Sequence, residues 1–167
     1  MINMDNLLEC AKALLQLTRE RRATLPEDGN LKLNRIALIG GLAEAFQANG
    51  IPAKVVVASA KFGQATISNM ALLSLGEHEQ YLDIHGNTGL DAILTAAFLG
   101  TKIDRTPEMK SEWSFKSFTA QQSRQSLWAE ETKCVEGWVQ QDRVFIEAML
   151  IEQVTPSRPD ASHRPRL

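Results

Sequence analysis

Hydrophobic residues recur every three or four positions in two stretches near the start of this chain, a spacing typical of helices with one buried face. The first stretch covers residues 4 to 22, and Asp5 stands where a cap would begin the helix. The second covers residues 33 to 49, and Asn49 and Gly50 would close it in a left-handed turn. Their apolar positions are Leu7, Leu8, Ala11, Leu14, Leu15 and Thr18, then Ile36, Ile39, Leu42, Ala43 and Phe46. We therefore expect two amphipathic helices with a turn at residues 25 to 30 between them.

After Gly50 the pattern becomes typical of β-strands. Residues 51 to 59 form a β-branched run, IPAKVVVAS, and residues 66 to 75 and 80 to 85 are expected as two further strands. Turns at residues 61 to 64 and 76 to 79 separate them, which predicts consecutive antiparallel strands. Residues 86 to 89 are expected as a loop, and residues 90 to 99 as a short apolar helix that ends at Gly100.

The remainder combines a mixed segment, a helical segment and a polar end. Residues 101 to 118 follow no clear period, so we expect irregular structure there. Residues 119 to 152 are helical in composition, and Gly137 is expected to break them into two helices. Residues 154 to 167 are rich in proline, serine and arginine, which predicts a disordered basic tail after one globular domain of residues 1 to 153.

The order of two helices and three consecutive strands predicts an α+β fold. In this class one face of a small antiparallel sheet packs on the central helix, and here additional helices follow toward the C-terminus. The adjacent Gly40 and Gly41 each cost about 1 kcal/mol in an exposed helix. We attribute them to close packing of the helix against a strand rather than to the approach of a ligand.

Composition narrows the classes of function. The 167 residues are 44% hydrophobic with a formal net charge of −2, which argues against a nonspecific nucleic-acid binder. Arg19, Arg21 and Arg22 form only a local basic cluster. No apolar run approaches the roughly 20 residues of a membrane span, and Asp5 and Glu9 oppose a secretory signal. We therefore expect a soluble, cytoplasmic protein with no membrane contact.

Cysteine and glycine usage gives no sign of a cofactor. Cys10 and Cys134 are isolated, without a CxxC pair or a His and Cys cluster at metal-ligand spacing. The glycines of IGGLAEAF lie within a helix pattern rather than in a phosphate-binding turn after a strand. We expect no metal and no cofactor.

Asp83 and His85 are the most informative pair of ionisable residues. Separated by the single residue Ile84 on a strand, they would share a face at the strand end, where enzymes often keep their chemistry. A carboxylate and an imidazole there would suit acid–base work or recognition of a polar ligand. The alternative is a strand end whose polar residues face water, with Asp83 bonding a turn.

The run NRIALIGGLAEAFQANGIPAKVVVAS, followed by a strand and then YLDIHG, resembles the core of papain-like and transglutaminase-like thiol hydrolases and transferases. The resemblance covers residues 31 to 95. In those families a cysteine starts the central helix, which ends in a Gly-Ile-Pro-Ala-like turn. A histidine opens the second strand, and an aspartate or asparagine lies on the third.

The resemblance assigns the nucleophile position to Arg35 or Asn34 and the histidine position to Asn69 or Met70, while Asp83 fills the aspartate position. A thiol mechanism needs a thiolate, a base and a group that orients the base. Two of these three are absent from their positions. The resemblance therefore implies a scaffold that has kept its shape and lost its chemistry.

Two functions follow. The first is a noncatalytic protein–protein interaction protein of inhibitor, adaptor or immunity type. The second is a thiol-dependent hydrolase or transferase with a rearranged site of Cys10, His85 and Asp83, which requires a lowered thiol pKa at Cys10. A weaker third idea, nucleic-acid binding through the arginines, would show as a steep salt dependence.

The late aromatic residues are candidates for a binding surface if they are exposed together. They are Trp113, Phe115, Phe118, Trp128 and Trp138. A protein partner is therefore expected, and the amphipathic C-terminal helical segment also allows a homodimer.

Overall fold

The computed structural model describes residues 3–22, 31–98, 111–125 and 127–154. The elements in chain order are α1 (Met4–Arg22), α2 (Leu31–Ala48), β1 (Ala53–Phe62), β2 (Ala65–Leu75), β3 (Gln80–Asp83), α3 (Leu90–Phe98), β4 (Glu112–Phe118), α4 (Ala120–Ser123) and α5 (Ala129–Val154). The α+β class is confirmed, because helices pack on one small antiparallel sheet.

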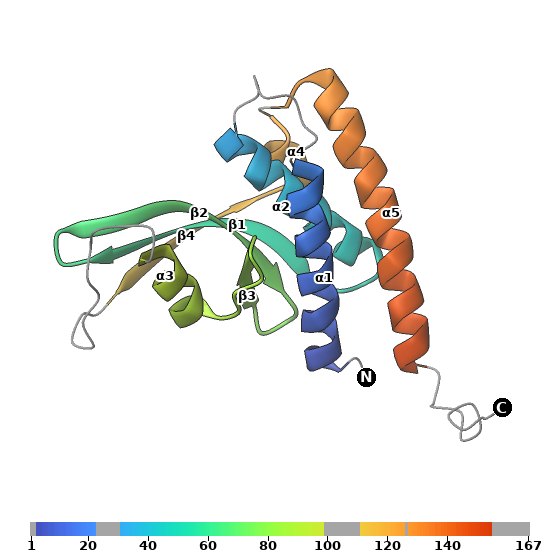
Figure 1. Ribbon diagram of the computed structural model, residues 1–167, viewed down its shortest axis with the longest axis horizontal. Coiled ribbons are helices and arrows are strands. Elements are labelled where there is room, and N and C mark those ends of the chain that lie inside the picture. Colours follow the sequence, from blue (N-terminus) through green and yellow to red (C-terminus); the bar gives the residue numbers. More distant parts are fainter. Residues whose placement is uncertain (1–2, 23–30, 99–110, 126, 155–167) are drawn as a thin grey trace.

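The four strands lie in the order β3-β2-β1-β4, and all neighbouring pairs are antiparallel (Figure 1). The long hairpin of β1 and β2 turns at Gly63 and Gln64, and Gly63 has a φ of +60°, which suits glycine. β3 is short and pairs only with the last four residues of β2, Leu72 to Leu75. On that side of the sheet, none of the described strands pairs with residues 65–71 of β2.

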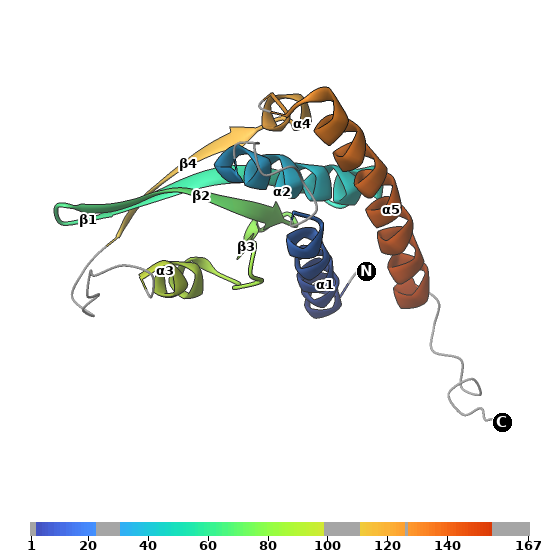
Figure 2. The ribbon, with the colours of Figure 1, turned by 45° about the horizontal axis from the view of Figure 1, so that its top comes forward.

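The two faces of the sheet are covered differently. α2 lies across one face, and α1 and α5 pack beside it, while α3 lies on the other side (Figures 1 and 2). The main core forms between α2 and the sheet, where Phe46, Leu73 and Leu75 are fully buried. On the other side, Leu94 and Phe98 of α3 pack against Ala60.

The C-terminal end of α2 and the N-terminal end of α1 are each set by hydrogen bonds between neighbouring residues. α2 ends as expected: Gly50 has a φ of +77°, and the N–H of Ile51 donates to Phe46 O at 3.1 Å, which is the pattern of a Schellman cap. At the start of α1 the expected cap is wrong. Asn3 Oδ1, one residue before the helix, accepts from the N–H of Asp5, so Asp5 lies in the first turn.

The glycine pair of α2 serves close packing, as expected, but chiefly against helices rather than a strand. A Cβ at Gly40 would lie 2.5 Å from Ser123 Oγ of α4, and 3.4 Å from Val55 of β1. A Cβ at Gly41 would lie 3.1 Å from both Val135 and Val139 of α5. These glycines let α4 and α5 approach the backbone of α2.

The expectation of irregular structure up to residue 118 is wrong for residues 112–118, which form the edge strand β4. β4 pairs with β1 from Val55↔Phe118 to Lys61↔Glu112. The residues of this edge strand are exposed or only half-buried, and its sequence EWSFKSF mixes aromatic and polar residues on both faces, so its period is weak. The strand forms because β1, fifty residues earlier, offers it a partner. Residues 101–110 lie outside the description.

The C-terminal helical segment begins with the short α4, where Thr119 and Gln122 form a capping box, and continues after a turn as α5. Gly137 does not break α5, because the helix runs on both sides of it without interruption. The helix includes Val154, so it passes the expected domain boundary by one residue. The rest of the expected tail, the turn at residues 25–30 and Gly100 lie outside the described residues.

Two smaller boundaries also differ from expectation. β1 continues to Phe62 across the expected turn, because the hairpin with β2 needs only two turn residues. β3 ends at Asp83 rather than at residue 85, because the chain turns back at Asp83.

Candidate functional site

Asp83 closes the end of β3. Its Oδ1 accepts the backbone N–H groups of His85 and Asn87, each at 2.9 Å, and its Oδ2 accepts Asn87 Nδ2 at 2.8 Å. The N–H of Gly86 donates to Asp83 O at 3.0 Å, and Gly86 has the positive φ of +84° that this reversal requires. The carboxylate therefore builds the turn, which confirms the interpretation of Asp83 as a turn-bonding residue.

His85 lies in this turn beyond the strand, and its side chain is exposed. It meets the Asp83 carboxylate through its backbone N–H. The two residues therefore do not share one strand face, because β3 has already ended between them.

A cleft of about 200 Å³ opens where β3 stops, and we call it the edge cleft. It lies at the edge of β2, between the start of α2, the turn after β3, and α3. The lining residues are Arg35, Met70, Ala71, Asp83, Ile84, His85, Ile93, Ala96 and Ala97. The cleft joins one cationic side chain and the polar turn to an apolar wall.

Three of the positions assigned by the papain-like resemblance line this cleft: Arg35, Met70 and Asp83. Asn69, the other histidine candidate, lies in a β-bulge where two residues of β2 oppose Ser59, and its φ of +60° is unusual for a residue other than glycine. The side chain of Asn34 is outside the described part of the chain. The cleft thus brings together an arginine, a methionine and an aspartate whose oxygens already accept hydrogen bonds.

Cys10 faces away from the edge cleft. The turn after β3 contacts the opposite side of α1, where Arg19 Nη1 donates to Ile84 O at 2.6 Å and Lys12 packs on Gly86. At 3.6 residues per turn, Cys10 lies about 180° around the helix from Arg19 and about 160° from Lys12. The rearranged site of Cys10, His85 and Asp83 is therefore not assembled.

The environment of Cys10 also opposes reactivity. Its side chain is buried in the main core. Burial, helped by the negative charge of Asp142, raises the pKa of the Cys10 thiol from 9.0 to about 11. Activated thiols have lowered pKa values, so this change has the wrong sign for a nucleophile.

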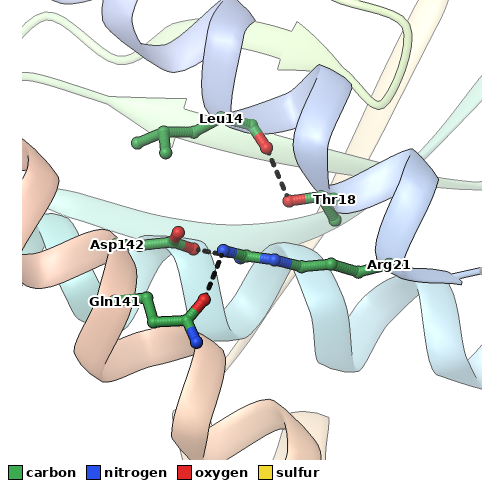
Figure 3. A network of polar contacts seen from close by, with 5 residues as sticks. All are labelled: Leu14, Thr18, Arg21, Gln141 and Asp142. Atoms are coloured by element: carbon green, nitrogen blue, oxygen red, sulfur yellow. Dashed lines mark hydrogen bonds and ion pairs between the residues drawn. The ribbon is translucent and has the colours of Figure 1, made fainter. Parts of the chain in front are cut away.

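A buried ion pair joins α1 to α5 (Figure 3). Arg21 Nη1 donates to Asp142 Oδ2 at 2.8 Å, and Nη2 donates to Gln141 Oε1 at 3.2 Å. Burial raises the pKa of the Asp142 carboxyl, and the hydrogen bond and charge of Arg21 only partly oppose this. Arg21 and Arg19 thus bind within the chain, which removes two members of the expected basic cluster.

The aromatic candidates lie in several places. Trp113 and Phe115 stack at 5.9 Å on the α3 side of the sheet, and Tyr81 of β3, which the sequence did not suggest, stacks on Phe115 at 5.2 Å. Phe118 lies on the opposite face and packs on the main core, as does Trp138. Phe115 is 43% exposed.

Trp128, just before α5, is 54% exposed. Its backbone N–H donates to Glu131 Oε1 at 3.0 Å, so its main chain belongs to the start of the helix. The five candidates therefore form no single surface.

Two further findings limit the chemistry of the described residues. They contain no group of three or more histidine, cysteine, aspartate or glutamate side chains arranged to hold a metal ion. No helix among them is both long and apolar enough to cross a bilayer.

Comparison of the chain with models of protein families, with curated proteins and with solved structures gave no match.

Proposed function

We propose that this protein is a noncatalytic, cytoplasmic interaction protein of inhibitor, adaptor or immunity type, on a papain-like scaffold whose catalytic positions have lost their chemistry. One observation carries the proposal. Arg35, Met70 and Asp83, which occupy positions assigned by the resemblance, line the same cleft, and none of them is a nucleophile. The three positions of the thiol-enzyme site that the resemblance implies thus lie together, but the cysteine and the histidine are replaced by other residues.

The edge cleft suits an extended segment of another protein. β3 stops at Leu72↔Asp83, so the next residues of β2 present main-chain groups along the cleft without a strand from the described residues beside them. An added strand would take up these groups, and its side chains would enter the pocket between α2 and α3. Ile93, Ala96 and Ala97 give that pocket an apolar wall.

The test is selection of random heptapeptides displayed on phage against the wild-type protein, followed by binding measurements with the synthetic peptides. Ala97→Phe fills the cleft, and Phe115→Ser is the matched control on the aromatic side of the sheet. We expect peptides whose affinity falls at least tenfold with Ala97→Phe and is unchanged with Phe115→Ser. Circular dichroism checks that both variants fold. Failure to select peptides, or loss with Phe115→Ser alone, contradicts binding at this cleft.

The noncatalytic part is tested separately by alkylation of Cys10 in the native protein across pH, read by intact mass. We expect slow labelling at neutral pH, unchanged by His85→Ala, because the thiol is buried and its pKa is raised. Cys10→Ser identifies the labelled residue. Fast labelling at neutral pH that slows with His85→Ala would overturn the proposal in favour of the thiol enzyme.

A further inference from the structure

The outer side of α5 exposes an apolar surface. Val144 is 58% exposed, Phe145 50% and Ile151 59%. The helix runs along the outside of the molecule in both views (Figures 1 and 2). The opposite side of the helix holds Val135, Val139 and Ile146 in the main core, so α5 is apolar on two sides.

The exposed side carries a regular repeat, which we call the outer seam: Cys134, Gly137, Gln141, Val144, Ala148 and Ile151. The positions alternate by three and four residues, which is the spacing of a helix that packs along a second helix. All six residues are exposed and uncharged. The charged residues Lys133 and Glu147 lie along one border of the seam, and the half-exposed Phe145 lies along the other, at the positions that flank the contact in two-helix interfaces.

We propose that the outer seam binds the same seam of a second copy of this chain, with the two α5 helices antiparallel. A two-fold axis near residues 142 and 143 pairs Ile151 with Cys134, Ala148 with Gly137, and Val144 with Gln141 of the second copy. Ile151 and Ala148 then face smaller residues, and Val144 faces Gln141, whose Oε1 is held by Arg21 of its own copy, so the helix axes keep a nearly constant separation. The antiparallel arrangement also aligns the helix dipoles favourably.

A parallel pair would fit worse. It would set Ile151 against Ile151 at one end and Gly137 against Gly137 at the other, so the gap would be wide at one end and narrow at the other. The antiparallel register also places Glu147 beside the uncharged Gln140 of the second copy, at the border of the contact. The formal net charge of −2 per chain opposes association only weakly.

The size of the outer seam indicates how tightly the two copies should associate. From Cys134 to Ile151 it is about 25 Å long at 1.5 Å per residue. Two such helices would bury on the order of 1,000 Å² in total, which is below the roughly 1,200–2,000 Å² of stable interfaces and in the range of weak, transient ones. We therefore expect a dimer that dissociates in the micromolar range.

Sedimentation velocity across the micromolar range tests association. We expect the wild-type protein to shift from monomer to dimer, and Val144→Glu to remain monomeric because it buries a charge in the seam. Gln64→Glu, at the exposed tip of the β1–β2 hairpin, adds the same charge elsewhere and should dimerise like the wild type. A wild-type monomer throughout, or a dimer that Val144→Glu leaves intact, overturns the proposal.

The register is tested with Cys134, which is already exposed. In the Ile151→Cys variant, a short bismaleimide should link Cys134 of one copy to position 151 of the other, identified by peptide mapping. A link from Cys134 to Cys134 overturns the antiparallel register. The seam lies away from the edge cleft. A negative result for the dimer therefore does not affect the proposed peptide binding, and a negative result for peptide binding does not affect the dimer.

Discussion

At the scale of single residues, the environment decides what each ionisable group can do. Asp83 has the residue type of a catalytic orienter, but its oxygens accept three hydrogen bonds within its own turn. Cys10 has the residue type of a nucleophile, but burial keeps its proton in place. Both groups therefore contribute to the stability of the fold.

Replacement of Asp83 by alanine should lower the free energy of unfolding by about 1–3 kcal/mol, because donors of Asn87 and His85 lose their acceptor. His85→Ala should change it by less than about 0.5 kcal/mol, since the His85 side chain is exposed. Urea unfolding of the two variants measures both effects. Equal effects would contradict the structural role of the Asp83 carboxylate.

Cys10 should make stability depend on alkaline pH. Its thiol loses a proton near 9.0 in the unfolded chain and near 11 in the folded one, so the folded state retains the proton longer. Relative to Cys10→Ala, the wild-type free energy of unfolding should be constant below pH 9 and fall by about 2 kcal/mol as the pH rises to 11. Denaturant melts of both proteins at several pH values measure the difference. A difference that rises with pH would show that the thiol ionises more readily in the fold.

At the scale of elements, the glycines show why a residue type alone does not reveal its purpose. Gly40 lies under Ser123 of α4, where a Cβ has no room, whereas a Cβ at Gly137 of α5 would meet nothing within 4 Å. Within one chain, Gly40 is needed for packing, whereas Gly137 lowers the stability of its helix.

Gly40→Ala should destabilise the fold by about 1–3 kcal/mol through overpacking against α4. Gly137→Ala, measured in dilute solution, should stabilise it by up to about 1 kcal/mol. In thermal unfolding, the melting temperature should fall for Gly40→Ala and rise for Gly137→Ala if the packing is as described. A second change, Ser123→Gly, removes the clashing atoms and should recover part of the loss in Gly40→Ala.

At the scale of the whole molecule, the Arg21–Asp142 pair connects residues 121 positions apart and holds the first helix to the last. The pair lies almost entirely away from water, with side-chain exposures of 9% and 4%. Removal of one partner of such a pair leaves a buried charge, which costs far more than the pair contributes.

Arg21→Met should therefore cost about 3–5 kcal/mol at neutral pH, and much of this should return in the double variant Arg21→Met with Asp142→Leu. Acid should also help the single variant. The pKa of Asp142 is already raised above 3.8, so the folded state binds a proton there more readily than the unfolded chain. The unfavourable contribution of the Asp142 carboxylate to the free energy of unfolding therefore becomes smaller as the pH falls toward 3.8. We expect this effect to be larger in the Arg21→Met variant. A loss that stays constant with pH would contradict the burial of this carboxylate.

Much of the fold is determined by local pattern. Apolar spacing places α1 and α2, β-branched runs place β1 and β2, and Gly50 fixes the end of α2, because these signals depend on neighbours in sequence. β4 had no such signal. It forms an edge strand whose order comes from pairing with β1.

The sequence by itself also determined the kinds of residue available: an aspartate and a histidine near a strand end, and two isolated cysteines. Only the tertiary structure decided their roles. It turned the chain after Asp83, set Cys10 on the far side of α1 from that turn, and brought Arg35 and Met70 to the edge cleft. It also left the outer seam of α5 exposed, without a covering element among the residues that the structure describes. The physical reason is that burial, direction and partner depend on contacts between distant segments, which residue spacing within one segment does not specify.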